Sequence, residues 1–251
     1  NTKIFYDKLF VFFSSAGRNT GNKTTFHRIS WSSKLNGMCL YIDDPMYKQY
    51  ENIGSGWYFG DEKNSVLMQI LDIVKIYTQK FQIENHNVFF TGASSAGYAA
   101  LYCANQLLGS LAYAYNPQIS LTKSPNYTSF LQATKIDLDR LKDDYSRADI
   151  SDITVNNESK FYVFFNSSSA RDKIQLEHLV EGLDYQIAPG AYVHNNINIV
   201  VSEFEHSNPH MCVGEIDDFI INIATRNIST IDKIDILNAS LMRFESYLLN
   251  L

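Results

Sequence analysis

The segment 87–101 constrains the fold of this chain more than any other stretch, because it combines a strand, a sharp turn and a helix. Its sequence, NVFFTGASSAGYAAL, runs from an apolar strand-like stretch through small residues into a helical one. Ser95 lies at the centre of the string ASSAG (residues 93–97). Small residues two positions before and after a serine let the backbone approach its neighbours closely. The segment therefore predicts a serine nucleophile held on a strand-to-helix turn.

A second serine fits the same turn. Ser94 is flanked by Gly92 and Ala96 at the spacing that Ala93 and Gly97 have around Ser95. The Ser95 frame departs from the pattern G-x-S-x-G at its first glycine. We predict Ser95 as the nucleophile, with Ser94 as the competing position.

Strand-like and helical segments alternate along the rest of the chain, which favours βαβ units and a mostly parallel sheet. We therefore predict an α/β fold with helices on both faces of the sheet, in a single domain covering residues 1–251. Residues 123–160 form a polar insertion with a helical middle at 136–141, either a small lid over the site or a surface excursion. The predicted strands are 9–13, 37–42, 88–91, 111–115, 161–165 and 197–201, and the predicted helices are 63–81, 98–108, 175–183, 213–224 and 231–249.

Candidates for the partners of the serine follow two late strands. A serine hydroxyl is a poor nucleophile until a neighbouring base takes its proton, and that base needs an orienting acid. Asp172 follows the strand 161–165 and is the predicted acid, although it also has the position of a helix cap. His206 follows the strand 197–201 and is the predicted base, with His210 as the alternative. The order nucleophile, acid, base places all three at the carboxyl edge of a parallel sheet.

Backbone N–H groups that stabilise a developing oxyanion are expected at two places. The residue after the nucleophile, Ala96, would supply one donor at the start of a helix. Ser15 or Ala16, in the small-residue loop after the strand 9–13, would supply the second. The alternative is that this loop is only a tight turn.

Composition narrows the function further. The net charge is −6 and no basic stripe is present, which argues against a nucleic-acid partner. The three cysteines are widely spaced and fit neither a disulfide framework nor a zinc site. We therefore expect no metal, and we expect a cytoplasmic location. No apolar run is long enough to span a membrane. The oligomeric state is left open.

Together these features resemble the α/β-hydrolase superfamily from Leu9 to about Ala224. A narrower likeness is to bacterial α/β-hydrolase-type enzymes that O-acetylate capsular polysaccharides, and hydrolase-like accessory secretion proteins are also similar. FSSAG at 13–17, NPQ at 116–118, Asp172 before a helix containing Leu and Glu, and HSN at 206–208 carry this likeness. The resemblance implies acetyl-CoA as the acyl donor, a bacterial polysaccharide hydroxyl as the acceptor, and an acyl-serine intermediate.

Two other functions are compatible with the same residues. A carboxylesterase or deacetylase would use the same three side chains and pass the acyl group to water. A non-catalytic module of the same fold would bind a glycan or a protein, because fold alone does not fix function.

Overall fold

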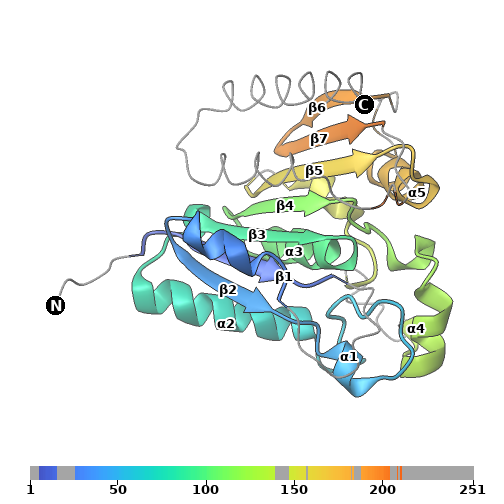
Figure 1. The fold of residues 1–251 in the computed structure, drawn as a ribbon, viewed down its shortest axis with the longest axis horizontal. Helices are drawn as coiled ribbons and strands as arrows, with labels where there is room; N and C mark the ends of the chain where they lie inside the picture. The colour runs from blue at the N-terminus through green and yellow to red at the C-terminus, as the bar shows by residue number, and fades with distance from the viewer. Residues whose placement is uncertain are drawn as a thin grey trace.

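The computed structural model describes residues 6–15, 26–138, 147–156, 158–181, 183, 188–203, 208 and 210. Its centre is a seven-stranded sheet in the order β2-β1-β3-β4-β5-β7-β6 (Figure 1). All neighbouring strands are parallel except the pair β6 and β7, which is antiparallel. The strands are β1 (Leu9–Phe13), β2 (Met38–Ile42), β3 (Val88–Ala93), β4 (Leu111–Tyr115), β5 (Lys160–Asn166), β6 (Gly190–His194) and β7 (Ile197–Ser202).

Helices connect the parallel strands. α2 illustrates why they form: Leu67, Ile70, Leu71 and Val74 recur at helical spacing and are buried, and Ser65 caps the start by accepting the Met68 N–H at 3.2 Å. The α-helices are α1 (Met46–Gln49), α2 (Val66–Phe81), α3 (Ser95–Gln106), α4 (Tyr127–Thr134) and α5 (Ala170–Leu179). Short 3-10 helices are η1 (Ile29–Ser33), η2 (Asn85–Asn87), η3 (Leu121–Lys123) and η5 (Ser151–Val155).

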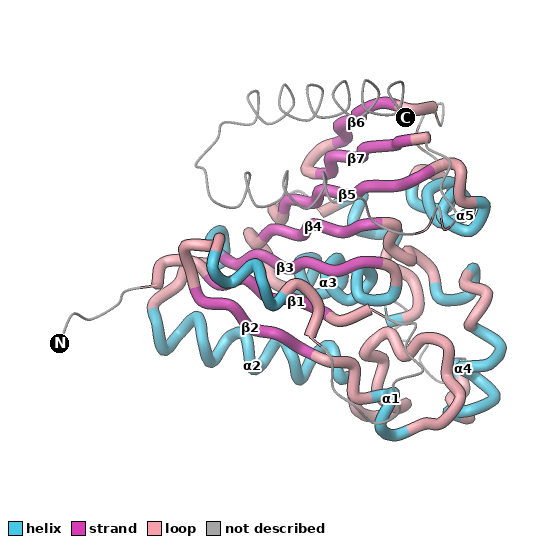
Figure 2. Tube along the Cα trace, viewed as in Figure 1, coloured by secondary structure: helices cyan, strands magenta, loops and turns pink. Residues whose placement is uncertain are grey.

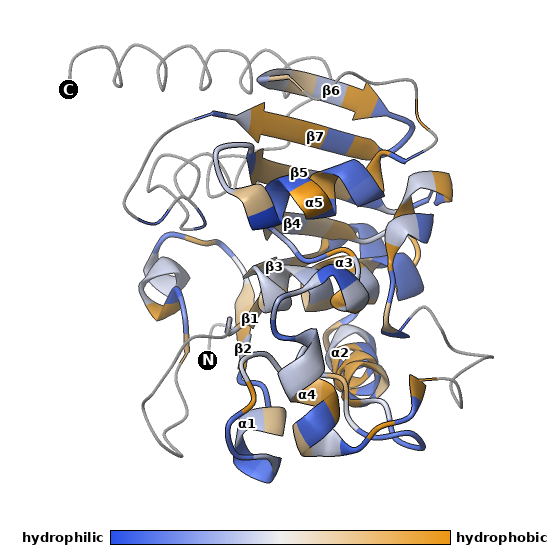
Figure 3. Ribbon diagram, turned by 90° about the vertical axis from the view of Figure 1, so that its right-hand side faces the viewer, coloured by the Kyte–Doolittle hydropathy of each residue, from blue (hydrophilic) through white to orange (hydrophobic). Residues whose placement is uncertain are grey.

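Both faces of the sheet are apolar, which explains why its strands are continuous hydrophobic runs rather than alternating ones. Leu9, Val11 and Phe13 of β1 belong to a core shared with α2, α3 and α5. Phe10 and Phe12 belong to a second, aromatic core on the opposite face, which η1 joins through Trp31. Figure 2 shows the strands as one twisted row, and Figure 3 shows β5 and β7 dominated by hydrophobic residues.

The mostly parallel α/β architecture predicted from the sequence is confirmed. The described α-helix of the insertion 123–160 is α4, at Tyr127–Thr134. Of the helical middle expected at 136–141, residues 136 and 137 are not helical, residue 138 is 3-10 helical, and 139–141 lie outside the described residues. Phe130 of α4 is fully buried against Trp57, with ring centroids 5.1 Å apart, so this helix packs into the core. The lid function of the insertion stays a prediction. The helices expected at 213–224 and 231–249 lie outside the described residues.

One strand was not predicted. β6 pairs with the edge of the sheet, and its side chains are half-buried or exposed. In the part of the chain that the structure describes, no helix has the length and apolar character needed to cross a membrane.

Candidate active site

The turn between β3 and α3 carries Ser94 at its tip. β3 ends at Ala93 and α3 begins at Ser95, so Ser94 is the single residue between strand and helix. Its φ of 55° and ψ of −121° form a backbone conformation that non-glycine residues rarely adopt. Ser94 is partly exposed, whereas Ser95 is 1% exposed. The strained, partly exposed residue of this turn is therefore Ser94, the competing position in the sequence, and the predicted Ser95 is the buried first residue of the helix.

The tight approach that supports this turn lies between Gly92 and Ala96. A Cβ on Gly92 would stand 2.2 Å from the Ala96 carbonyl oxygen and 2.9 Å from the Ala96 Cβ. These residues are two positions before and two positions after Ser94. Gly97, the second small residue of the Ser95 frame, instead faces Pro117, whose Cβ would lie 2.9 Å from an added Cβ. The packing thus follows the frame G-x-S-x-A centred on Ser94.

Gly92→Ala should lower the free energy of unfolding by about 3 kcal/mol or more, because the added methyl meets backbone atoms that cannot move aside. Urea denaturation measures this loss. Gly109→Ala is the matched control, since Gly109 has φ +86° and its added Cβ finds no atom nearer than 3.7 Å. That control should cost about 1 kcal/mol, from backbone strain alone. Equal losses in the two variants would contradict a close approach at the turn.

Ser95 and Ala96 form the first turn of α3. Burial raises the pKa of the Tyr47 phenol, and a hydrogen bond with the Ser95 side chain lowers it, so the Ser95 hydroxyl already has a partner inside the protein. The first N–H groups of a helix have no intrahelical acceptors. The Ser95 N–H directly follows Ser94 at the tip, and the N–H of Ala96, the predicted donor, is the next one along the helix.

The loop after β1 is held by two side chains. The Tyr58 hydroxyl accepts the Ser14 N–H at 2.7 Å and donates to the Ser14 carbonyl at 2.8 Å. The Ser15 N–H and hydroxyl lie 3.3 and 3.1 Å from His27 Nδ1. Ser15 is therefore placed at the carboxyl end of β1 as predicted, with its N–H directed at His27. Ala16, the other predicted donor, lies outside the described residues.

A buried carboxyl group supports the same loop. Asp44 is 1% exposed and accepts the N–H groups of Met46 at 3.0 Å and Tyr58 at 3.1 Å. Burial raises the pKa of Asp44 to about 7, against the lowering effect of these two N–H donors. The supporting roles of Asp44 and Tyr58 could not be predicted from the sequence, because hydrogen bonds from a side chain to a distant backbone segment follow no sequence motif.

A histidine and an aspartate from different segments meet at the carboxyl edge of the sheet. His210 Nδ1 lies 2.6 Å from Asp172 Oδ1. The Asp172 side chain is 2% exposed and that of His210 is 15% exposed. Asp172 lies in the first turn of α5, where Ser169 is the N-cap residue, so its carboxylate serves the histidine rather than the cap. Among the described residues, Asp172 Oδ2 has no hydrogen-bond partner.

His210 is the base candidate that the structure pairs with the predicted acid. His206, the first choice from the sequence, lies outside the described residues, so its role stays a prediction.

Asn116, directly after β4, fixes the backbone of His210. Its side-chain amide donates to the His210 carbonyl at 2.9 Å, and its side-chain oxygen accepts the Asn166 N–H at 2.9 Å. Its own N–H donates to the Phe164 carbonyl at 2.6 Å. One asparagine therefore ties the histidine to the carboxyl ends of β4 and β5.

The same turn holds Ser94. The Ser94 N–H donates to the Tyr115 carbonyl at 2.9 Å, and the Gln118 N–H donates to the Ser94 carbonyl at 3.2 Å. Asn116 lies between Tyr115 and Gln118 in the chain. The backbone of the strained serine and the backbone carbonyl of His210 are thus both bonded to the four residues 115–118.

No protein-family model matches the chain, and no curated protein sequence matches it. Solved structures do. The capsule O-acetyltransferase of Neisseria meningitidis serogroup A superposes with a TM-score of 0.62 at 16% identity, over 87% of each chain. A mutant of that enzyme has been solved in complex with CoA.

Two hydrolases also superpose. An S-formylglutathione hydrolase from Agrobacterium tumefaciens has a TM-score of 0.56 at 13% identity, over 87% of this chain and 84% of the other. An acetyl xylan esterase from Paenibacillus sp. R4 has a TM-score of 0.54 at 12% identity, over 89% of this chain and 76% of the other. These likenesses establish that the protein has the α/β-hydrolase fold.

Metal ligands do not gather in the part of the chain that the structure describes: no group of three or more His, Cys, Asp or Glu side chains is placed there to hold an ion.

Proposed function

We propose that this protein is an acyl-transfer enzyme in which Ser94 is the nucleophile, His210 the general base and Asp172 the residue that orients the imidazole. The 2.6 Å contact between His210 and Asp172 carries the proposal, supported by Asn116, which bonds to the His210 carbonyl from the segment 115–118 that also holds Ser94. With Nδ1 facing the carboxylate, Nε2 is the nitrogen left to take the serine proton. The carboxylate also stabilises the imidazolium that results.

The reaction runs in two balanced halves. Ser94 Oγ attacks the acyl carbonyl carbon while its proton passes to His210 Nε2. The bond from the acyl carbon to the leaving sulfur or oxygen then breaks, and the leaving group takes that proton. An acceptor hydroxyl next attacks the acyl-serine and gives its proton to His210. The ester bond to Ser94 breaks, and Ser94 recovers the proton. The Ser95 N–H, at the start of α3, would stabilise the oxyanion in both halves.

Acetyl-CoA is the proposed donor and a bacterial polysaccharide hydroxyl the proposed acceptor. The fold likeness to a capsule O-acetyltransferase supports this choice, as does the CoA complex of that neighbour. Transfer to water is the second candidate, favoured by the likeness to an acetyl xylan esterase.

Intact-protein mass spectrometry after incubation with acetyl-CoA tests the proposal. We expect an added acetyl group on the peptide that contains Ser94, and faster discharge of that group when an acetyl-accepting capsular polysaccharide is present. Discharge at the same rate without glycan would favour the esterase. Absence of both acetylation and labelling by a fluorophosphonate would leave only a non-catalytic binding module.

A further inference from the structure

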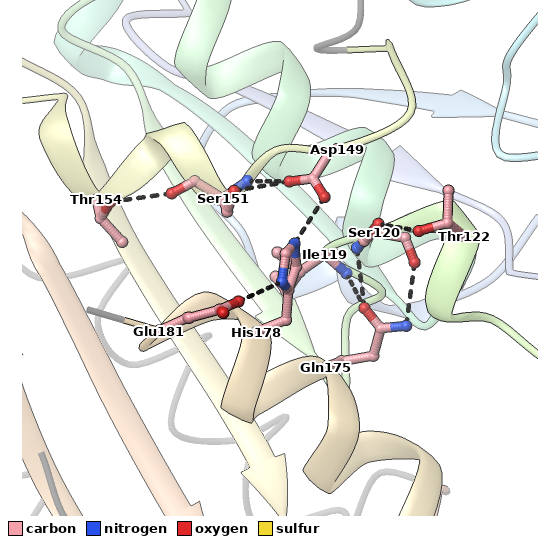
Figure 4. Close-up of polar contacts among 9 residues, drawn as sticks. All are labelled: Ile119, Ser120, Thr122, Asp149, Ser151, Thr154, Gln175, His178 and Glu181. Carbon is pink, nitrogen blue, oxygen red and sulfur yellow. Dashed lines mark hydrogen bonds and ion pairs between the residues drawn. The ribbon is translucent and has the colours of Figure 1, made fainter. Parts of the chain in front are cut away.

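The amide side chain of Gln175 connects α5 to the loop beside the serine turn. Gln175 is 2% exposed. Its oxygen accepts the N–H groups of Ile119 at 2.7 Å and Ser120 at 2.9 Å, and its nitrogen donates to the Ser120 carbonyl at 3.1 Å (Figure 4). One buried amide therefore makes three hydrogen bonds to the backbone of one loop.

The two ends of this connection are parts of the site. Asp172 lies three residues before Gln175 on α5, hence on the same face of the helix. On the other side, Ile119 directly follows Gln118, whose N–H donates to the Ser94 carbonyl at 3.2 Å. Gln175 thus links α5, which contains Asp172, to the loop that follows Gln118, the residue that bonds to the Ser94 carbonyl.

His178, one turn further along α5, attaches the other end of the helix. His178 Nε2 lies 2.6 Å from Asp149 Oδ2, and Nδ1 lies 3.3 Å from Glu181 Oε2 (Figure 4). Burial raises the pKa of Asp149, but hydrogen bonds from Ser151 and His178 outweigh that effect, so this carboxyl titrates below its ordinary range. Asp149 lies in a segment that pairs with the loop held by Gln175, since the Ile150 N–H donates to the Ile119 carbonyl at 3.0 Å. His178 therefore reaches this loop only through Asp149, whereas Gln175 bonds to the loop backbone directly.

We propose that Gln175 is a positioning residue for acyl transfer: it sets the distance between Asp172 and the serine turn, and so aligns the imidazole of His210 with Ser94. The inference rests on the proposed function. A misplacement of about 1 Å in a catalytic group reduces rates by about 10²-fold, so a link of this kind has a large effect without touching substrate.

Gln175→Met keeps the length of the side chain and removes the amide bonds. We expect kcat toward a small aryl acetate to fall about 10- to 100-fold with KM changed less than about two-fold, because α5 shifts while the acyl pocket stays. Gln175→Glu keeps both N–H bonds to its oxygen and should recover part of the rate.

His178→Leu is the matched control, because it removes the other attachment of α5. Urea unfolding ranks the stability of all variants, and rates are compared at a temperature where each is folded. We expect His178→Leu to lose stability while keeping kcat and KM within about two-fold. Equal kinetic losses in Gln175→Met and His178→Leu at equal stability, or wild-type kinetics in Gln175→Met, would overturn the inference.

A readout that needs no turnover separates this inference from the proposed function. The Nδ1 proton of His210, held against Asp172, should give a low-field proton NMR signal that Asp172→Asn removes. Gln175→Met should move or broaden this signal, and His178→Leu should not. A shifted signal in a protein that forms no acyl-serine would retain Gln175 as a positioning residue for the pair and reject the enzyme. An unshifted signal in an active enzyme would reject the positioning role of Gln175 and leave the proposed function intact.

Discussion

Ser94→Ala should abolish labelling by a fluorophosphonate and reduce acyl transfer from acetyl-CoA by at least about 10⁴-fold. Without the Ser94 oxygen no acyl-serine ester can form, so the residual rate comes only from substrate binding and oxyanion stabilisation. Gel fluorescence with the probe reports the nucleophile without knowledge of the acceptor. Intact mass after incubation with acetyl-CoA reports the acyl-enzyme itself.

Ser95→Ala is the control that makes this result specific. Ser95 is buried, its hydroxyl is bonded to Tyr47, and its backbone N–H remains after the substitution. We expect this variant to keep probe labelling, to lose less than about ten-fold in rate, and to lose about 1 kcal/mol of stability with the hydrogen bond. A labelled Ser94→Ala protein together with an unlabelled Ser95→Ala protein would place the nucleophile one residue later, in the frame that the sequence favours.

The spacing of small residues in the sequence does not decide between Ser94 and Ser95. Both have small residues two positions away on either side, so spacing alone allows either frame. The choice depends on which residue takes the positive φ, and that is set by where β3 stops pairing with β4, at Ala93. The backbone path places Gly92 against Ala96, whereas Gly97 faces Pro117.

The strands of the sheet were predictable because burial on both faces makes each one a continuous apolar run. β1 is LFVFF and β5 is KFYVFFN, and each stops at small or polar residues. β6 was missed because an edge strand with half-exposed side chains has no such run: GAYVH mixes small, aromatic and polar residues. Its pairing with β7 depends on the turn at Asn195, where φ is 50°.

The chemistry of the site was easier to predict than its supports. Strand order places an acid and a histidine at one edge, and the structure brings Asp172 together with a histidine from the segment after β7. Asn116 and Gln175 bond to backbone atoms distant in sequence, and nothing in their local sequence indicates those partners. Which histidine reaches the acid depends on the path of a loop, which composition does not set.

His210→Ala should therefore lower kcat/KM for an activated aryl acetate by about 10³- to 10⁴-fold, because the serine then has no base and the oxyanion no balancing imidazolium. His206→Ala, made in parallel, should keep the rate within about ten-fold. Steady-state hydrolysis of the aryl acetate measures both variants.

The structural reason for this expectation is that Nδ1 of His210 lies 2.6 Å from Asp172 Oδ1, and Asn116 fixes the carbonyl of the same histidine. A base that replaced His210 would need both contacts. Asp172→Asn is the companion variant: an amide in place of the carboxylate favours the wrong imidazole tautomer, with a loss of similar size expected. If His206→Ala is the inactive variant and His210→Ala keeps its activity, the base is a different ring, and the pair described here is a structural contact of α5.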